Sequence, residues 1–425
     1  MIQWGVAFIC CSAASDPYTE DMTRAKTDLK SPAKPSSKVA AKKTAVKAPG
    51  KTPLKASAKA AKTVKRSADP SARPSVDLAL QGGGSHGAFT WGVLNRLLED
   101  DGLNISGISG TSAGAMNGAV MLTGYVKGFR EGGEARARER AQQALKDFWA
   151  DVSGHGPLFS PLTFDASGAL KPQFNVDQLP GYQFLNLFTR TFSPYEFNPL
   201  NLNPLRDAVQ RHVDVDALHD GCSGCGIHLF VTATSVRTGQ ARVFTDKELS
   251  HDALMASACL PVIFQAVNID GEDYWDGGYT GNPALYPLIY NTESSDILLI
   301  KINPIQRDET PTRMMDIVDR LSEITFNTSL LAEMRAIAFV KRLLKEDKLD
   351  EVRYKDIRMH MVADDEGLLP YNASSKSNTD AAFLKHLHDL GYEATGRWLL
   401  AHKADVGVRS SLDIERTFLT PTHQG

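Results

Sequence analysis

Cysteine is scarce in this chain, with five residues among 425. They are Cys10, Cys11, Cys222, Cys225 and Cys259. An odd, small number does not build a disulfide framework, so a reducing compartment is the default expectation. Cys222 and Cys225 form a lone C-x-x-C pair without the second pair of ligands that a structural zinc site needs. We therefore expect a flexible glycine turn with two incidental thiols there, and no metal.

Long apolar runs are also missing, since none reaches the ~18 residues that span a bilayer. Residues 4–14 are apolar, but the run is short and lacks the basic segment of a secretory signal peptide. A start at Met22 or later is an alternative interpretation of this end. We expect a cytoplasmic protein whose contact with a membrane, if it has one, is peripheral.

Acidic residues are absent from residues 30–66, which hold eleven lysines and Arg66. Aromatic residues are absent between Tyr18 and Phe89, and prolines at 32, 35, 49 and 53 interrupt any helix. Such a segment cannot bury enough apolar area to fold, which predicts a disordered basic tail over residues 1–75.

The basic tail and the rest of the chain carry net charges of opposite sign. Removing its twelve positive charges from the formal net charge of −3 leaves −15 for the rest of the chain. The tail could contact polyanions non-specifically, either nucleic acid or anionic lipid, or it could be a solvated linker. Both interpretations stay open, and the oligomeric state cannot be predicted.

Glycine, in contrast, gathers in two short stretches that follow apolar runs. Residues 81–87 (QGGGSHG) follow the predicted strand 76–80, and residues 110–114 (GTSAG) follow the predicted strand 105–109. Helical segments, residues 88–98 and 115–122, come next in each case. Strand, glycine loop and helix, twice in succession, is how an α/β sheet presents backbone amides and one side chain at its carboxyl edge.

The second stretch fits G-x-S-x-G, with Ser112 between Gly110 and Gly114. Such a serine lies on a sharp turn between strand and helix, with its hydroxyl pushed out of the backbone. Ser112 also falls at a helix N-terminus, which favours developing negative charge. The glycines of the first stretch let the backbone approach a substrate oxygen and donate N–H groups as an oxyanion hole.

Together with Asp276-Gly277-Gly278, these stretches resemble the bacterial type of the patatin-like phospholipase family over roughly residues 75–345. The family has G-G-G-x-[RK]-G, then G-x-S-x-G, then D-G-[GA]. One departure is His86, which stands where the family usually has arginine or lysine, so a permanent positive charge near the loop is lost.

The resemblance implies a three-layer α/β/α hydrolase with a mostly parallel central sheet. We expect a catalytic domain over residues 76–345, and a C-terminal strand and helix within 346–425 that pack on it. Helices are expected at 205–213, 252–259 and 381–402 and one or two over 313–344, with strands at 227–235, 241–245, 296–302 and 357–362. Residues 154–204 show little helical period, and aromatic residues there could line an acyl channel or belong to the core.

The resemblance also implies an activity: hydrolysis of acyl esters of (phospho)lipids through an acyl-serine intermediate. The family uses a Ser–Asp dyad without histidine, which makes Ser112 the nucleophile and Asp276 the base. The oxyanion hole would comprise Gly82, Gly83 and Gly84. The backbone geometry of these motifs would depend on Gly87, Gly110, Gly114, Gly277 and Gly278. No cofactor is implied.

Several alternatives compete with this interpretation. The segment 82–87 formally matches the dinucleotide motif G-x-G-x-x-G, but the acidic residue expected ~20 residues on is absent. A histidine could complete a triad, yet His228, His251, His360 and His386 lack a motif context, and His86 alone lies near the predicted site. The chain could act as an esterase or depolymerase on another hydrophobic ester, or as a binding protein that uses the basic tail.

Overall fold

The structure is a computed structural model that describes residues 73–154, 162–164, 170–172, 174–177, 179–307, 309–350 and 352–420. The predicted tail lies almost wholly outside these residues. Within the described part, no helix combines the length and hydropathy needed to cross a bilayer.

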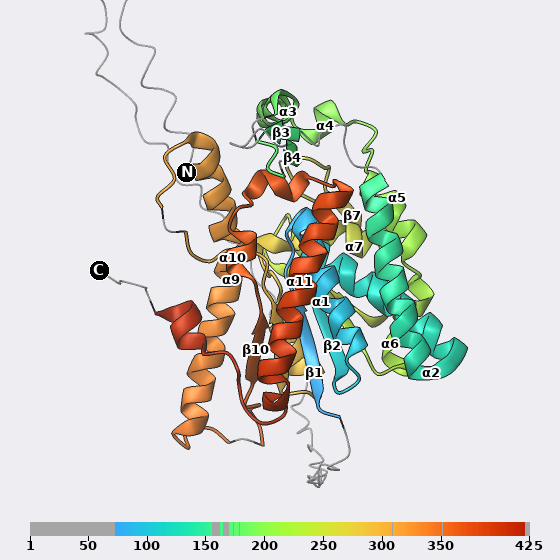
Figure 1. Cartoon of the computed structure of the whole chain (residues 1–425), viewed down its shortest axis with the longest axis vertical. Coiled ribbons are helices and arrows are strands. Elements are labelled where there is room, and N and C mark those ends of the chain that lie inside the picture. Colours follow the sequence, from blue (N-terminus) through green and yellow to red (C-terminus); the bar gives the residue numbers. More distant parts are fainter. Residues whose placement is uncertain are drawn as a thin grey trace, which may run out of the picture. The chain divides into compact units, whose positions relative to one another are not determined.

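A mixed eight-stranded sheet forms the centre, in the order β10-β9-β1-β2-β5-β8-β7, with β6 pairing with β5 (Figure 1). The strands are β1 Ser75–Leu80, β2 Asn104–Thr111, β5 His228–Ser235, β6 Ala241–Thr245, β7 Val267–Ile269, β8 Glu272–Asp276, β9 Asp296–Ile300 and β10 Arg358–Val362. A separate hairpin joins β3 Leu162–Phe164 to β4 Leu170–Pro172. Strands β10, β9, β1, β2 and β5 are parallel, whereas β6, β7 and β8 run antiparallel to their partners.

The central strands are apolar on both faces, because helices cover both sides of the sheet. In β1, Leu78 and Leu80 face one core cluster and Ala79 faces the other. In β9 the same alternation places Leu298 in the first cluster and Leu299 in the second. This arrangement, in which a mostly parallel sheet lies between two layers of helices, confirms the predicted fold class.

The first cluster is built with helices α1 Gly87–Glu99, α2 Ala113–Gly154, α5 Pro204–His212, α6 Val215–Gly224, α7 His251–Ser257 and α11 Ala381–His402. The second is built with α8 Tyr286–Asn291 and α9 Met314–Lys345. The remaining α-helices of the described residues are α3 Pro180–Thr191, α4 Pro194–Phe197 and α10 Asp365–Leu368. The C-terminal part contributes an edge strand, β10, and a helix, α11, that lies along α1 (Figure 1).

The segment after Ser112 forms two helices that meet at a kink, and the first of them extends well beyond the expected helical residues 115–122. Within α2, Gly132 and Gly133 have non-helical backbone angles and turn the chain back. A Cβ on Gly124 would lie 2.6 Å from the Arg140 carbonyl oxygen, so the two halves pack closely as an antiparallel hairpin.

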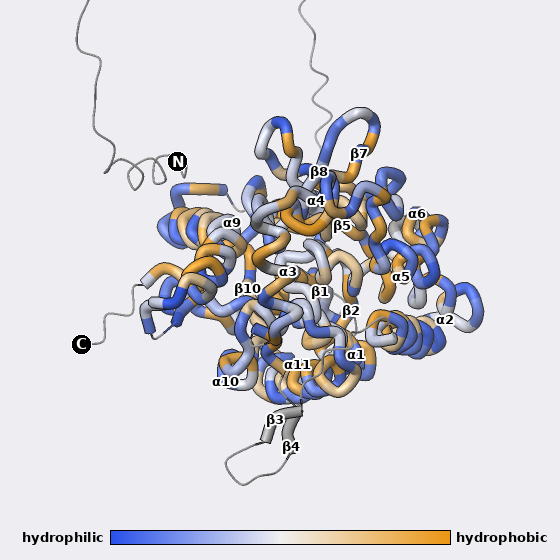
Figure 2. Tube along the Cα trace, turned by 90° about the horizontal axis from the view of Figure 1, so that it is seen from above, coloured by the Kyte–Doolittle hydropathy of each residue, from blue (hydrophilic) through white to orange (hydrophobic). Residues whose placement is uncertain are grey.

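Two expectations were wrong. Residues 180–191, predicted without helical period, form α3, which lies beyond the carboxyl ends of the strands and near the centre of the view along them (Figures 1 and 2). Large apolar side chains of α3 lie outside the core, because Phe184 and Leu187 are 67% and 66% exposed. The Cys222–Cys225 pair lies at the end of α6 rather than in a flexible glycine turn.

Candidate active site

Ser112 lies at the junction of β2 and α2, at the carboxyl edge of the sheet. Its backbone has φ of 52°, a left-handed conformation that non-glycine residues rarely adopt and that often marks functional sites. The Ser112 N–H donates to the hydroxyl of Ser257 at 2.9 Å, which fixes the bend. The hydroxyl of Ser112 therefore projects at the start of a helix, as in a nucleophile elbow.

Asp276 reaches Ser112 across one intervening strand. It ends β8, whose register pairs Asp276 with Ala233 of β5, while β5 pairs with β2 on its other side through Thr232 and Thr111. The Ser112 side chain lies close enough to the Asp276 carboxylate to lower its pKa, and the N–H of Gly278 donates to that carboxylate at 2.7 Å. The two predicted side chains thus meet, although they are far apart in sequence.

The Asp276 carboxyl group is 1% exposed. Burial raises the pKa of Asp276 to about 7, and the hydrogen bonds from Gly278 and Ser112 lower it only in part. Among the described residues no cation forms an ion pair with this carboxylate, so desolvation dominates. A carboxylate with a pKa near neutrality beside a serine hydroxyl has the basicity that proton abstraction needs.

The glycine loop after β1 faces the same edge. The N–H of Gly82 donates to Asn282 Oδ1 at 2.6 Å, and the carbonyl oxygen of Gly82 accepts from Asn303 Nδ2 at 2.7 Å. Gly82 therefore anchors the loop and, in this structure, has no N–H left for a substrate. Among the described residues, the N–H groups of Gly83 and Gly84 have no hydrogen-bond acceptor. Gly84 has φ of +58°, which favours glycine there.

The other motif glycines allow close approach of backbone segments. A Cβ on Gly114 would overlap the carbonyl oxygen of Leu80, and one on Gly277 would overlap that of Thr232. Three more contacts have the same character: a Cβ on Gly87 would lie 2.7 Å from the Ala113 Cβ, one on Gly110 2.7 Å from the Ala115 nitrogen, and one on Gly278 3.0 Å from Asp276 Oδ1.

His86 is buried in the wall of the loop, at 3% exposure. Its Nε2 lies 2.7 Å from the Ser375 hydroxyl, which itself donates to the Asn372 carbonyl, so Nε2 carries the proton and donates. Burial, together with the smaller effect of the nearby charges of Lys376 and Arg307, lowers the pKa of His86 to about 3. His86 is thus neutral and has no hydrogen bond to Ser112 or Asp276.

A cation nevertheless lies near the loop. The ammonium group of Lys376 donates to Asn303 Oδ1 at 2.8 Å, and the same Asn303 side chain holds the Gly82 carbonyl. The positive charge that His86 does not supply is therefore provided by a distant part of the chain.

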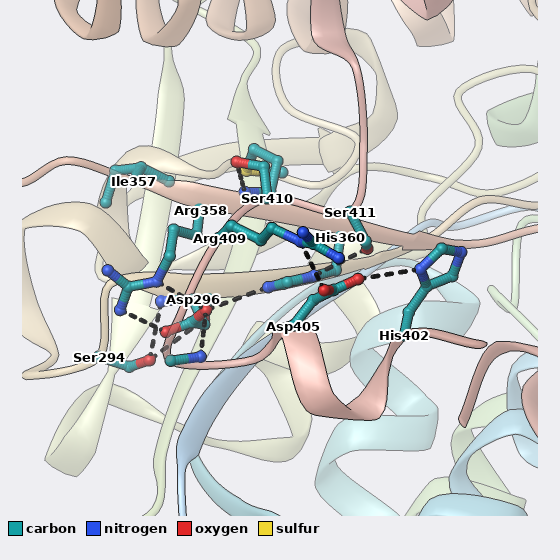
Figure 3. Close-up of polar contacts among 12 residues, drawn as sticks. Ser294, Asp296, Ile357, Arg358, His360, His402, Asp405, Arg409, Ser410 and Ser411 are labelled. Carbon is teal, nitrogen blue, oxygen red and sulfur yellow. Dashed lines mark hydrogen bonds and ion pairs between the residues drawn. The ribbon is translucent and has the colours of Figure 1, made fainter. Parts of the chain in front are cut away.

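Another serine, histidine and aspartate form a chain of hydrogen bonds (Figure 3). They lie towards the amino ends of the parallel strands, away from the carboxyl edge that carries Ser112. His360 Nδ1 lies 2.8 Å from Ser411 Oγ, and its Nε2 lies 3.0 Å from Asp296 Oδ1. The Asp296 carboxylate also accepts two bonds from Arg358 and one from the Gly407 N–H. This saturated, buried cluster fastens the C-terminal segment to the first residues of β9 and β10.

The other histidines considered for a triad are engaged elsewhere. His251 Nε2 pairs with the Val213 carbonyl and His386 with the Tyr371 hydroxyl, while His228 lies 3.9 Å from Asp246. In the part of the chain that the structure describes, no group of three or more His, Cys, Asp or Glu side chains is placed to hold a metal.

A sequence model of a known protein family matches this chain. The sequence model described as patatin-like phospholipase matches residues 78–289, which span both glycine stretches and Asp276. The chain belongs to the patatin-like phospholipase family. Membership of this family supports a lipid-hydrolase function and lipid substrates.

Solved structures were also compared with this patatin-like chain. VipD from Legionella pneumophila aligns with 13% identity and a TM-score of 0.30, covering 78% of this chain and 67% of that chain. No curated protein matches the sequence.

Several residues around the patatin-like site escaped the sequence analysis. Asn282, Asn303 and Ser257 orient the backbone of the glycine loop and of Ser112. Asn303 follows β9 at the carboxyl edge, where polar residues of a parallel sheet gather, so its position was a usable signal. Lys376 lies in a segment without any motif, so no sequence signal indicated its position near the site.

Proposed function

We propose that this chain is a serine acyl hydrolase that cleaves acyl esters of lipids through a Ser112–Asp276 dyad. The observation that carries the proposal is the proximity of a serine on a left-handed bend to a buried carboxylate whose pKa is raised to about 7. The N–H groups of Gly83 and Gly84, which have no acceptor among the described residues, are the proposed oxyanion donors.

In the first half-reaction, Ser112 Oγ attacks the acyl carbonyl carbon while Asp276 takes the hydroxyl proton. The carbonyl oxygen becomes the oxyanion, and the two loop amides donate to it. The tetrahedral intermediate then expels the alcohol, which receives the proton from Asp276, and the acyl group stays on Ser112 as an ester.

In the second half-reaction, a water molecule attacks the acyl-serine carbonyl and gives its proton to Asp276. The collapse of this second intermediate releases the fatty acid and returns the proton to Ser112. Asp276 therefore acts alternately as base and acid, a role that suits a group whose pKa lies near the operating pH.

A direct test uses Ser112→Ala and Asp276→Asn with a short-chain aryl ester. We expect each variant to lose turnover by about a hundredfold or more, because each removes a group that acts in the transition state. Ser322→Ala, on the exposed side of α9, is the matched control and should keep wild-type turnover. Turnover retained in either site variant would remove that residue from the mechanism.

Two further measurements separate this proposal from its rivals. A fluorophosphonate probe should label Ser112 of the wild type by displacement of fluoride, and an unlabelled protein would favour a binding role. Comparison of phospholipid vesicles, triacylglycerol and polyester particles as substrates distinguishes a phospholipase from an esterase or depolymerase.

A further inference from the structure

The peptide unit between Gly82 and Gly83 links the anchored part of the glycine loop to its free donors. It consists of the Gly82 carbonyl and the Gly83 N–H, which has no acceptor among the described residues and is a proposed oxyanion donor. Because this peptide unit is planar and trans, its C=O and N–H point in opposite directions. A contact that fixes the Gly82 carbonyl therefore also fixes the direction in which the Gly83 N–H can donate.

The Gly82 carbonyl is held by the side chain of Asn303. Asn303 Nδ2 donates to the Gly82 oxygen at 2.7 Å, and a longer bond from Asn282 Nδ2, at 3.3 Å, reaches the same oxygen. Asn303 is fully buried. Its amide group therefore depends on other protein groups for its hydrogen bonds.

Lys376 supplies the hydrogen bond on the other side of this amide. Its ammonium group donates to Asn303 Oδ1 at 2.8 Å. An ammonium group only donates and a carbonyl oxygen only accepts, so one orientation of the amide satisfies both neighbours, with Oδ1 towards Lys376 and Nδ2 towards Gly82. Without the lysine, Oδ1 would be a buried acceptor with no donor among the described residues, which is costly.

Lys376 also contacts the loop through its main chain, since a Cβ on Gly84 would overlap the Lys376 carbonyl oxygen. Burial lowers the pKa of its side chain, whereas the charges of Glu323 and Asp319 raise it and favour the ammonium form. Among the described residues this ammonium group forms no ion pair, and its hydrogen bond goes to the uncharged Asn303. A buried charge at one end of a chain of hydrogen bonds polarises the bonds that follow.

We propose that Lys376 is a positioning residue of the oxyanion hole and acts through Asn303 on the Gly82–Gly83 peptide unit. The donors then run in one direction: the ammonium donates to Asn303, Asn303 to the Gly82 carbonyl, and the Gly83 N–H to the oxyanion. Each bond polarises the next, which makes the Gly83 N–H a stronger donor for the negative charge of the transition state. This inference rests on the proposed acyl-hydrolase function and adds one residue to its machinery.

The test uses the full chain and a short-chain aryl ester, with kcat expressed per serine that the fluorophosphonate probe labels at completion. This normalisation removes any misfolded fraction. We expect Lys376→Met to lower kcat by about 10- to 100-fold and to change KM by less than about twofold, because the oxyanion is absent from the ground state. Lys376→Arg should restore part of kcat. Ser377→Ala, an exposed neighbour in the same turn, is the matched control and should keep wild-type turnover.

A pair of inhibitors isolates the effect on the oxyanion. The carbonyl carbon of a trifluoromethyl ketone forms a bond with Ser112 Oγ, the ketone oxygen takes the negative charge, and the serine proton passes to Asp276. The matching methyl ketone binds mainly as the uncharged ketone. Lys376→Met should weaken inhibition by the trifluoromethyl ketone by about the same factor as kcat, and it should leave inhibition by the methyl ketone unchanged.

A double-mutant cycle tests whether Lys376 acts through Asn303. If it does, Asn303→Ala alone should lower kcat as much as Asn303→Ala combined with Lys376→Met, because the first change already interrupts the chain of bonds.

Several results would overturn the inference. Fewer labelled serines with a wild-type kcat per serine would make Lys376 purely structural. Equal weakening of both ketones would show no specific effect on the oxyanion, and losses that add in the double variant would show that the two side chains act independently. A wild type without turnover would remove the hydrolase function and this inference with it, whereas an active wild type and an equally active Lys376→Met would remove the inference alone.

Discussion

Replacing Asp276 by asparagine should make the protein more stable at alkaline pH while it removes the proposed base. The carboxylate is buried and bonded only by Gly278 and Ser112, so ionisation in the folded state is costly. Asparagine retains an oxygen for the Gly278 N–H and an amide donor for the Ser112 oxygen, without the charge.

The magnitude follows from proton linkage. The pKa of Asp276 is about 7 in the folded protein against 3.8 for an unperturbed aspartate, so the folded state binds more protons between these values. A raised carboxyl pKa makes stability decrease as pH rises through this window. From pH 5 to pH 8 the Asp276 contribution falls by about 3 kcal/mol, at about 1.4 kcal/mol per pH unit up to the folded pKa.

Urea unfolding of the full chain at pH 5, 6, 7 and 8 measures this effect. Burial also raises the pKa values of Glu333, to about 7, and Asp319, to about 6, and both act in the same direction. The quantity to compare is therefore the difference between Asp276→Asn and wild type, in which those groups cancel. We expect the difference to grow in favour of the variant above pH 6. A difference that is constant with pH, or that favours the wild type at pH 8, would refute the reasoning.

Three other outcomes are expected. The kcat/KM for a neutral aryl ester should fall below pH 7 with a slope of one, because Asp276 must be deprotonated to act as the base; a flat profile from pH 5 to pH 8 would contradict this. Gly114→Ala should cost about 3 kcal/mol of stability, since its Cβ would overlap the Leu80 carbonyl, which thermal unfolding can test against wild type. Asp296→Asn should cost about 3 kcal/mol at pH 7, and this loss should vanish at acid pH. The partners of Asp296, including His360, hold its pKa at about 2, so its contribution is present above pH 4 and disappears as pH falls towards 2.

The sheet could be predicted largely from the sequence because its strands have strong local signals. The run 296–302 contains β9, and residues 227–235 and 241–245 match β5 and β6 closely. The helix predicted at 381–402 has the bounds of α11. Continuous apolar runs specify strands buried on both faces, and periodic apolar positions specify helices with one buried face.

The helix α3 was missed for a physical reason. Its large apolar side chains, such as Phe184 and Leu187, are exposed, so the usual relation between hydropathy and burial does not apply. The glycine loop illustrates a second limit. Three successive glycines indicate a donor site, but only the tertiary contact with Asn282 shows that the first N–H is already occupied.

The contact of Ser112 with Asp276 could be anticipated only through the family resemblance. Propensity and spacing carry no information on which distant side chains meet, and the antiparallel strand β8 that carries Asp276 across β5 follows from the assembled sheet. Lys376 shows the same limit, since nothing in its neighbourhood in the sequence indicates that it lies beside Gly84.

The close contact of Gly84 with the main chain of Lys376 limits how far the chain can be truncated. The family match ends at residue 289, and both residues of the proposed dyad fall inside it. The backing of the glycine loop, however, is made by Ile302, Asn303 and the turn at 372–378, all of which come later. A fragment cut at the end of the matched region would keep the reacting groups but leave the loop without its support, so expression trials should retain the chain through α11.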